Sequence, residues 1–548
     1  MRTQFQTPFT DISVNFDLRG VPEGDRELLP LLGGALGSVG VVTRAGERLD
    51  YAAARERIMA EIYDAGVGVA AYPRSDRAEL SFSATASSPE EVDRAVAWIE
   101  NYLLRPGLTP AARERLIDTL RAGIQGWRGI FQQDEESWVS EAVAAYRYQD
   151  RPLYMNISSP FTVLRSLNRL RWRLEDPAPE RLAALRAAAA EVMAAAKTSD
   201  RAAAEKLLAG VDGEFGEYLR WEFAHLPDDS WRADLRTLAS DFLADVGHPA
   251  ETIRRLQALA AGVLVRTGTR VHINGNAANS DRAARQLETL LDRLPRGRQA
   301  AAPPRKDLVV GRLRQRLPGI GRPAHVALVN NGGKTGTISV WTPAAGYNSF
   351  QPGDLPDALA LGILAGGGAH SLFMRTWGAG LAYSNGLGLY ASIGQARYYA
   401  DKCPDPAQTL RFAAGVAAET KIEDTSQLEY SLATSFADYR AAGSFSSRGA
   451  ALAYDLEEGN RPEAVHAYKY ALLELARRPG TLTLVRARFL KALGRVLPGL
   501  PGGRVSDSPQ AGAFLTGPDS LIRSYESFVR EKGEAAEVVR LYPRDFWP

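Results

Sequence analysis

The sequence has few of the residues that mark a self-sufficient enzyme. Its 548 residues include one cysteine, Cys403, which excludes an internal disulfide framework and a thiolate zinc site within the chain. Cys403 lies in Asp-Lys-Cys-Pro-Asp-Pro, where we expect a passive loop residue rather than a nucleophile. The six histidines are scattered, and none forms His-Glu-x-x-His or His-x-x-Glu-His. The sequence therefore offers no complete catalytic site and no metal site of its own.

Charge of one sign and long apolar runs are also lacking. The net charge is +2, so no overall field favours nucleic acid or an anionic membrane. No apolar run reaches the ~18 residues of a membrane span, and the nearest candidate, 358–373, is broken by glycines. The first residues are polar and show no signal peptide. We expect no nucleic-acid partner, no membrane contact and a cytoplasmic location, provided that Met1 is the natural start.

The length and a basic, proline-rich stretch predict the domain organisation. A chain of 548 residues is long enough for two to four domains at roughly 150 residues each. We place a first domain at 1–295, a linker at 296–322 and a second domain at 323–548. The linker is rich in arginine, with Asp307 as its one acid. A nucleic-acid patch is the alternative, but no aromatic residues are interleaved, so a solvated linker is favoured.

Hydrophobic periodicity predicts an α+β fold in which helices cover a mainly antiparallel sheet. The first half is expected to continue as one long helical region over 111–261. In the second half, Asn330-Asn-Gly-Gly indicates a hairpin turn. The expected strands are 12–18, 68–72, 77–86, 324–330, 335–342 and 383–393, and the main helices of the repeated pattern are 28–39, 51–65, 90–104 and 355–375.

The two halves share an internal similarity. A shift of 326 residues brings Ile12-Ser-Val, Gly20 and Leu29-Pro onto Ile338-Ser-Val, Gly346 and Leu355-Pro, which gives six identical residues over 19 positions. A strand, a turn and the start of a helix coincide under this shift. We therefore expect two copies of one α+β unit.

The stretch from His370 to Tyr390 carries the candidate site. The expected helix ends at Arg375, Gly378-Ala-Gly turns the chain, and Tyr383 opens a strand. Arg375 would offer a planar fork of donors and Tyr383 a hydroxyl, which together can hold a peptide backbone or polarise its carbonyl. The alternative is structural: an arginine near a helix C-terminus suits the helix dipole, and a strand tyrosine often packs.

Three stretches resemble the carboxyl-terminal half of pitrilysin/insulinase-type zinc metallopeptidases in their presequence-protease-like form. The first runs from Ile12 to Val39-Gly40, the second joins Glu135-Glu-Ser-Trp-Val, Ala145-Tyr-Arg-Tyr-Gln and Leu167-Asn-Arg-Leu-Arg-Trp, and the third is 375–383. The resemblance implies two repeated metallopeptidase-like units that form one half-shell of a closed chamber. The family's zinc motif would fall on Leu31, Gly34 and Ala35, which cannot bind zinc or move a proton.

The resemblance also implies how the work is divided between two halves. A partner half with His-x-x-Glu-His would hold Zn²⁺, while Arg375 and Tyr383 would bind peptide substrates; this chain alone would be inactive. The spacing of Arg375 and Tyr383 is eight residues, where the common family pattern has seven, so the arginine fits less well than the tyrosine. Degenerate members of this fold also serve as scaffolding subunits, and that alternative stays open.

Overall fold

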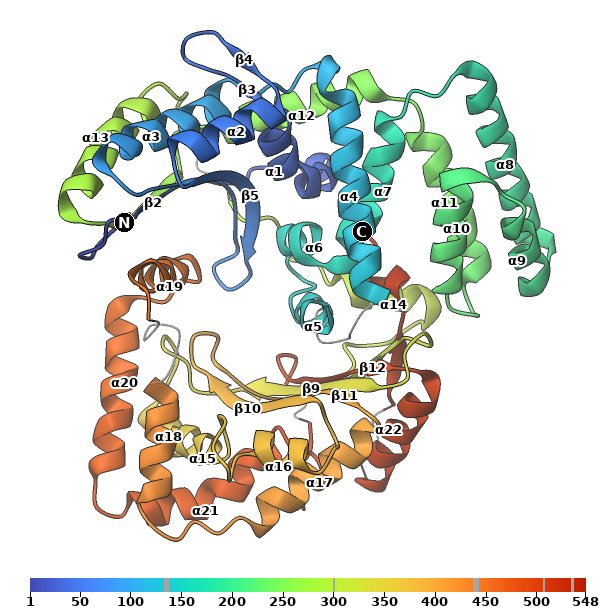
Figure 1. Cartoon of the computed structure of the whole chain (residues 1–548). Coiled ribbons are helices and arrows are strands. Elements are labelled where there is room, and N and C mark those ends of the chain that lie inside the picture. The colour runs from blue at the N-terminus through green and yellow to red at the C-terminus, as the bar shows by residue number, and fades with distance from the viewer. Residues whose placement is uncertain (133–137, 299–300, 437–442, 506–507, 534–536) are drawn as a thin grey trace. The chain divides into compact units, whose positions relative to one another are not determined.

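The computed structural model describes the chain except for residues 133–137, 299–300, 437–442, 506–507 and 534–536. The chain divides into two units, each built around one sheet (Figure 1). Unit 1 comprises Met1–Gly129, Tyr148–Pro318 and Tyr542–Pro548, and unit 2 comprises Ile130–Arg147 and Gly319–Leu541. Residues 135–137 of the second resembling stretch and 299–300 of the expected linker lie outside the described residues.

The sheet of unit 1 has helices over one face (Figure 1). Its strands, in spatial order, are β1 (Arg2–Gln4), β7 (Arg270–Gly275), β2 (Thr10–Asp17), β6 (Arg77–Ala86) and β5 (Asp64–Tyr72). Only β1 and β7 pair in parallel within this sheet. Because side chains alternate along a strand, Ile12, Val14 and Phe16 enter the core. The helices here are α1 (Leu29–Ser38), α2 (Tyr51–Glu61), α3 (Pro89–Leu104) and α13 (Ala277–Leu291), and a small ribbon joins β3 (Val41–Val42) to β4 (Arg48–Leu49).

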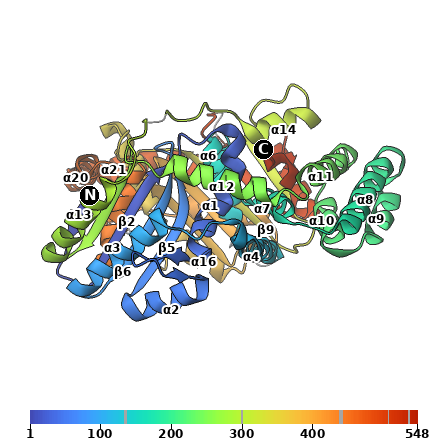
Figure 2. The same ribbon diagram turned by 90° about the horizontal axis from the view of Figure 1, so that it is seen from above.

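The long helical region of unit 1 is confirmed. Part of it, from α8 (Pro179–Thr198) to α11 (Trp231–Asp245), forms a lobe (Figure 2). The core of this lobe includes Trp172 of the preceding helix, whose ring centroid lies 4.9 Å from that of Phe242. The bulky aromatic residues of this stretch therefore fill one shared interior. The helices are α4 (Arg113–Gln132), α6 (Pro152–Ser158), α7 (Pro160–Leu174), α8 (Pro179–Thr198), α9 (Arg201–Ala209), α10 (Gly213–Ala224), α11 (Trp231–Asp245) and α12 (Pro249–Val263).

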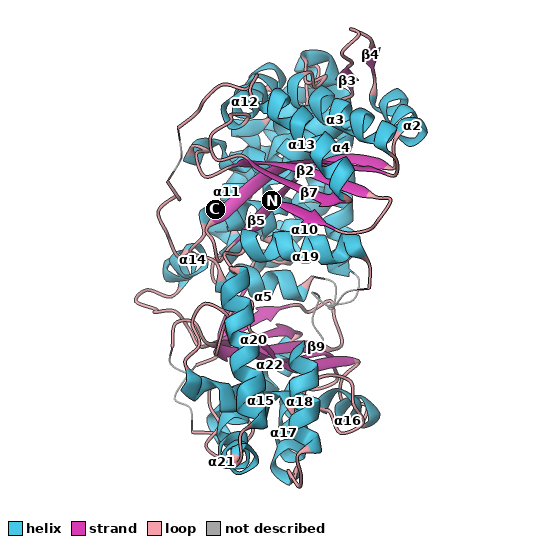
Figure 3. Cartoon of the chain, turned by 90° about the vertical axis from the view of Figure 1, so that its left-hand side faces the viewer, coloured by secondary structure: helices cyan, strands magenta, loops and turns pink. Residues whose placement is uncertain are grey.

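Unit 2 repeats the strand arrangement of unit 1 and adds one strand at an edge. Its strands, beginning with the added one, are β13 (Val539–Leu541), β8 (His325–Val329), β12 (Gly512–Gly517), β9 (Gly336–Pro343), β11 (Gln395–Cys403) and β10 (Ser384–Tyr390). β9 has the bounds of β2 shifted by 326, and α15 begins 326 residues after α1. The expected α+β fold with two repeated units is confirmed. Most helices of this unit again gather on one side of the sheet, whereas α19 (Phe445–Glu457) lies apart from them (Figure 3). The others are α15 (Leu355–Gly362), α16 (Leu372–Gly378), α17 (Pro406–Glu419), α18 (Ser426–Phe436), α20 (Pro462–Arg477), α21 (Thr481–Gly494) and α22 (Asp519–Glu531).

Two local expectations for unit 2 are wrong. β8 and β9 do not form a hairpin, because β12 lies between them and pairs with both. The helix expected over 355–375 is broken into α15 and α16. The break follows from Gly366, whose φ of +72° is a left-handed conformation that only glycine adopts readily.

The segment expected to be a solvated linker is partly helical. Leu308–Arg316 forms α14, and its Val309, Val310 and Leu313 are buried. Arg316 is bonded to Asp545 at 2.9 Å, and Arg312 donates to the carbonyl of Trp547 at 3.0 Å. Arg316 thus pairs with a carboxylate of the chain and Arg312 with a carbonyl. These two arginines are therefore not free to bind nucleic acid.

Each unit also contains a segment that is distant in the sequence. In unit 2, α5 (Val139–Arg147) covers part of the sheet face opposite the helices: Tyr146 lies 6.0 Å from Phe514, and Arg147 lies over Trp341. In unit 1, the hydroxyl of Thr162 donates to the carbonyl of Phe546 at 2.6 Å. No helix in the described part of the chain is long and apolar enough to cross a membrane.

Gly40 ends the region that carries the first resembling stretch, and its substitution should destabilise unit 1. Its φ is +76°, and a Cβ there would lie 2.2 Å from the carbonyl oxygen of Leu49. We expect Gly40→Ala to lower the free energy of unfolding by about 3 kcal/mol or more. Gly46 has a φ of +85° in open space, so Gly46→Ala should cost about 1 kcal/mol. Urea unfolding of both variants checks this, and equal losses would contradict it.

Candidate substrate-binding site

The loop that leads into α16 is fixed by one phenol of α18. The hydroxyl of Tyr430 donates to the carbonyl of Ala365 at 2.8 Å and accepts from the N–H of Gly368 at 3.1 Å. Ser371 then caps α16, with its Oγ accepting from the N–H of Met374 at 3.3 Å. The glycines therefore allow the loop to bend sharply, while Tyr430 and Ser371 fix its conformation by hydrogen bonds.

Three hydrogen bonds fix the turn between α16 and β10. The N–H of Leu381 donates to the carbonyl of Thr376 at 3.3 Å. The hydroxyl of Thr409, on α17, donates to the carbonyl of Leu381 at 2.9 Å. The amide of Asn385, on β10, donates to the carbonyl of Phe373 at 3.2 Å. Gly380 makes the turn possible with a φ of +70°.

Arg375 lies in α16 and Tyr383 lies directly before β10, which is an edge strand of the sheet in the described part of the chain. Both side chains are exposed, and Tyr383 is 61% exposed. The N–H of Tyr383 donates to the carbonyl of Asp401 at 3.0 Å, so its backbone already follows the ladder. No ion pair or side-chain hydrogen bond involves Arg375 within the described residues. Their part in substrate binding stays a prediction.

Three further side chains belong to this surface and were missed from the sequence. Met374 and Trp377 are exposed on α16, one helical turn apart, and Trp377 is 54% exposed. The ammonium group of Lys402 lies 4.4 Å from the centroid of the Tyr383 ring. Lys402 has a φ of +51° beside an irregularity in the β11 ladder, which its sequence did not indicate. Large apolar groups thus accompany the guanidinium of Arg375 on α16, and an ammonium group accompanies the phenol of Tyr383.

The positions that the resemblance assigned to a zinc motif cannot hold zinc. Leu31 and Ala35 are buried apolar residues of α1, and a Cβ at Gly34 would contact Thr119. The same shift of 326 leads in unit 2 to Asp357, Ala360 and Leu361, and one carboxylate does not make a zinc site. Among the described residues no group of three or more His, Cys, Asp or Glu side chains is placed to bind a metal.

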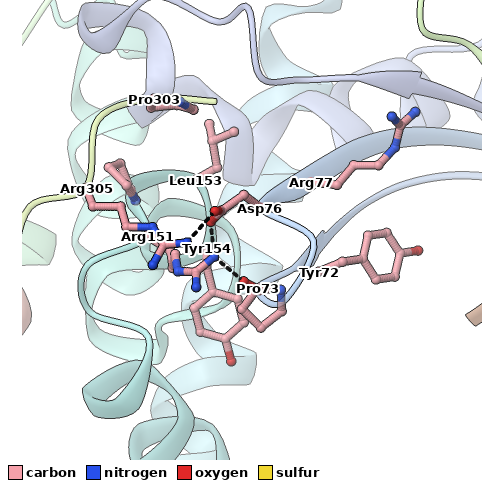
Figure 4. A pocket seen from close by; sticks show the side chains of 10 residues that line it. Tyr72, Pro73, Asp76, Arg77, Arg151, Leu153, Tyr154, Pro303 and Arg305 are labelled. Carbon is pink, nitrogen blue, oxygen red and sulfur yellow. Dashed lines mark hydrogen bonds and ion pairs between the residues drawn. The ribbon is translucent and has the colours of Figure 1, made fainter. Parts of the chain in front are cut away.

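A pocket beside the turn between β5 and β6 is filled by its own charges (Figure 4). Arg151 is paired with Asp76, and Arg305 donates to the other oxygen of Asp76 at 2.8 Å. Arg151 also donates to the carbonyl of Pro73. The pocket thus joins the stretch before α14 to the sheet, and its polar groups serve this structural purpose.

The sheet face of unit 1 that lies opposite the helices is polar. Ser13 donates to Asn15 at 2.8 Å, and its hydroxyl lies 3.2 Å from that of Ser81. Thr85 donates to Asp11 at 3.0 Å. His272 on β7 belongs to the same face, and burial lowers its pKa to about 4. This face is hydrogen-bonded rather than apolar.

Comparisons with known proteins support the fold. No family model matches the chain, and no curated protein matches it. A protease from Helicobacter pylori is similar over 94% of this chain and 96% of its own, with a TM-score of 0.54 and 10% identity. A peptidase M16 inactive domain from Pseudomonas fluorescens covers 94% of each chain at 14% identity and a TM-score of 0.47. Complex III2 from Candida albicans, with Inz-5 bound, covers 98% of this chain and 97% of its own at 11% identity and a TM-score of 0.45.

The fold of this chain is therefore also that of a protease of known structure. The two-unit α+β fold that the resemblance implied is confirmed by this similarity. The TM-score of 0.54 shows a shared fold, and the identity of 10% is too low to say anything about activity. The other two structures have TM-scores below 0.5 and carry no argument.

Loss of the Thr409 hydroxyl should loosen the candidate site. Thr409→Val keeps the volume but removes the bond to Leu381, and we expect a loss of about 1 kcal/mol of stability. Amide hydrogen exchange over 374–383 should become faster. Thr420→Val, which removes a hydroxyl bonded within α17's own last turn, is the matched control; equal exchange over 374–383 in the two variants would contradict the assignment.

His272 should make folding stability depend on pH. Its pKa is about 4 in the folded chain and about 6.5 when unfolded, so the unfolded state binds the additional proton between these values. The contribution of the neutral imidazole is therefore complete above pH 6.5 and is lost as the pH falls toward 4. Denaturant unfolding of wild type and His272→Gln over this range should show that wild type loses stability relative to the variant as the pH falls from 6.5 to 4. Parallel curves would show that His272 does not titrate as described.

Proposed function

We propose that this chain is the half or subunit of a zinc metallopeptidase that does not bind zinc. Its role is to contribute substrate-contacting side chains and one wall of the chamber in which peptides are degraded. The observation that carries the proposal is the exposure of Arg375, in α16, and of Tyr383, directly before the edge strand β10. It is supported by a fold shared with a protease and by apolar residues at the zinc-motif positions.

The chemistry assigned to this chain is binding and orientation. The guanidinium of Arg375 donates to a substrate carbonyl, and the phenol of Tyr383 donates to the oxygen on which negative charge develops. Preorganisation matters here, because a donor that is already in place costs no rearrangement during the reaction. The bonds from Thr409, Asn385 and Tyr430 supply that order.

The zinc, and the water that it activates, belong to a partner half with His-x-x-Glu-His. Zinc lowers the pKa of its bound water toward neutrality and makes it a nucleophile. The residues at the zinc-motif positions do not fit a zinc site, so no step of hydrolysis is assigned to this chain by itself. The polar face of unit 1 suits the wall of a water-filled chamber for peptides.

The second candidate function is a scaffolding subunit of the same fold. Buried Leu31 and Ala35 fit it equally well, because apolar residues at those positions stabilise α1 whether or not peptides are bound. The two functions differ in what Arg375 and Tyr383 do. A substrate-contacting pair changes turnover when it is mutated, whereas a scaffold tolerates the loss of either group.

Peptidase activity with zinc should appear only when this chain is mixed with the zinc-bearing half. We expect Tyr383→Phe to lower kcat of the mixture by about 10- to 100-fold, because one donor to the developing oxyanion is removed. Tyr470→Phe, at a tyrosine that is 57% exposed on α20, is the control and should have no effect.

Other outcomes decide between the candidates. If the mixture stays fully active with the Tyr383→Phe variant and also with the Arg375→Ala variant, the substrate-contacting role is refuted and the scaffolding function is favoured. No gain on mixing would also favour the scaffold. Hydrolysis by this chain without a partner would refute both.

A further inference from the structure

The segment that carries Tyr383 has a counterpart in unit 1. A shift of 320 brings Arg55 and Tyr63 onto Arg375 and Tyr383. Each tyrosine directly precedes a strand, β5 or β10, that lies at an edge of its sheet in the described part of the chain. The N–H of each tyrosine donates to a carbonyl of the neighbouring strand, at 3.1 Å in unit 1 and at 3.0 Å in unit 2. The two backbones can therefore be compared residue by residue.

The residue opposite the tyrosine differs between the two copies. When the β5–β6 register is continued by one residue, Ala86 falls opposite Tyr63, and the β10–β11 register places Lys402 opposite Tyr383 in the same way. Ala86 is fully buried and ends a strand whose pairing with β2 is regular. A lysine at that place in a regular strand would enter the apolar core, where its charge would be costly. Unit 2 therefore needs a different backbone here.

A β-bulge in β11 supplies this backbone. Between the paired residues Ala400 and Cys403, β11 has two residues, Asp401 and Lys402, whereas β9 has only Thr337. Ala400 and Cys403 are both buried although they are three positions apart, so the alternation of side chains is shifted by one residue across the bulge. This shift takes the side chain of Lys402 off the apolar face, and Lys402 is half-buried.

The bulge is formed with a strained backbone at Lys402. Its φ of +51° is a left-handed conformation that suits glycine and disfavours residues with a side chain. In the described part of the chain, Asp76 is the other non-glycine residue with a positive φ, and it is held by ion pairs with Arg151 and Arg305. Glycine would allow the same bulge without strain, so the strain points to a role for the lysine side chain itself.

The side chain of Lys402 lies against the phenol of Tyr383. Its ammonium group is 4.4 Å from the ring centroid, well inside the ~6 Å range of a cation–π interaction. The tyrosine is 61% exposed, and an exposed side chain has rotamer entropy that a ligand must remove on binding. A cation held over the ring limits this motion, so the phenol is ordered before a ligand arrives.

We propose that Lys402 is the positioning residue of Tyr383, whose ring it holds by a cation–π interaction, and that the β-bulge of unit 2 serves to place it there. Lys402 acts through the tyrosine and need not contact a substrate. The reason for holding the phenol rests on the proposed function, in which Tyr383 donates to the developing oxyanion. A donor that is already oriented acts without rearrangement, so Lys402 contributes to turnover through Tyr383.

The first test measures ring motion in the full chain alone. Tyrosine is labelled with carbon-13 in its ring, the signal of Tyr383 is the one that disappears in Tyr383→Phe, and NMR relaxation reports the motion. We expect faster motion in Lys402→Met and wild-type motion in Lys402→Arg. Lys469→Met removes a cation that lies 5.0 Å from the centroid of the Phe436 ring and should leave the Tyr383 signal unchanged. Unchanged motion in Lys402→Met would refute the proposal, whether or not the chain acts in a peptidase.

The second test uses Lys402→Gly to separate positioning from stability. Because glycine suits the φ of +51°, this variant should unfold at a higher urea concentration than wild type. In the mixture with the zinc-bearing half, we expect it to lower kcat about two- to fivefold, the size of an exposed cation–π interaction. It should have no further effect when Tyr383→Phe is already present. A lysine with a purely structural role would give a variant that is more stable and fully active.

The two tests separate this inference from the proposed function. If Tyr383→Phe lowers kcat and Lys402→Gly does not, the positioning role is refuted. It is also refuted if Lys402→Gly lowers kcat by the same factor with and without Tyr383→Phe. If Lys402→Met frees the ring but Tyr383→Phe leaves the mixture fully active, the positioning role stands and the proposed function fails.

Discussion

The alternation of side chains along the strands is the constraint on which the rest of the molecule depends. In β2 every second residue enters an apolar core, and the residues between them form a polar face. Helices can cover the apolar face of such a sheet without burying unpaired polar groups, whereas the other face keeps its hydrogen-bonding side chains. The open faces, edge strands and exposed tyrosines all follow from this division.

The repeat explains why similar surfaces occur twice, and the differences explain why they are not equivalent. α2 and α16 precede corresponding edge strands, but α2 runs almost to Tyr63, while α16 ends before a glycine turn. The longer helix brings Arg55 against the start of its strand. The turn at Gly380 leaves Arg375 exposed. One duplicated pattern thus gives an arginine that is bonded to the start of a strand and another that is exposed.

Much of the fold could be predicted from the sequence, because it rests on local patterns. The strand at Ile12–Phe16 and the helix after Pro89 reflect residues that are near one another in the chain, and the 326-residue shift reflects one such local pattern that occurs twice. The strand order could not be predicted, since β12 enters between β8 and β9 from far away in the sequence. The break before α16 was missed because the apolar pattern continues across Gly366, whose backbone leaves the helix. Arg375 and Tyr383 could be proposed from the resemblance and stay predictions, whereas the position of Lys402 beside Tyr383 required the actual course of β11.

The position of residues 542–548 has a consequence for how the protein is made. They belong to unit 1, where Thr162 bonds the carbonyl of Phe546 and Arg312 bonds that of Trp547. The ribosome synthesises almost all of unit 2 before it reaches them. Unit 1 therefore lacks these contacts until nearly all of unit 2 has been synthesised, although most of unit 1 is made first.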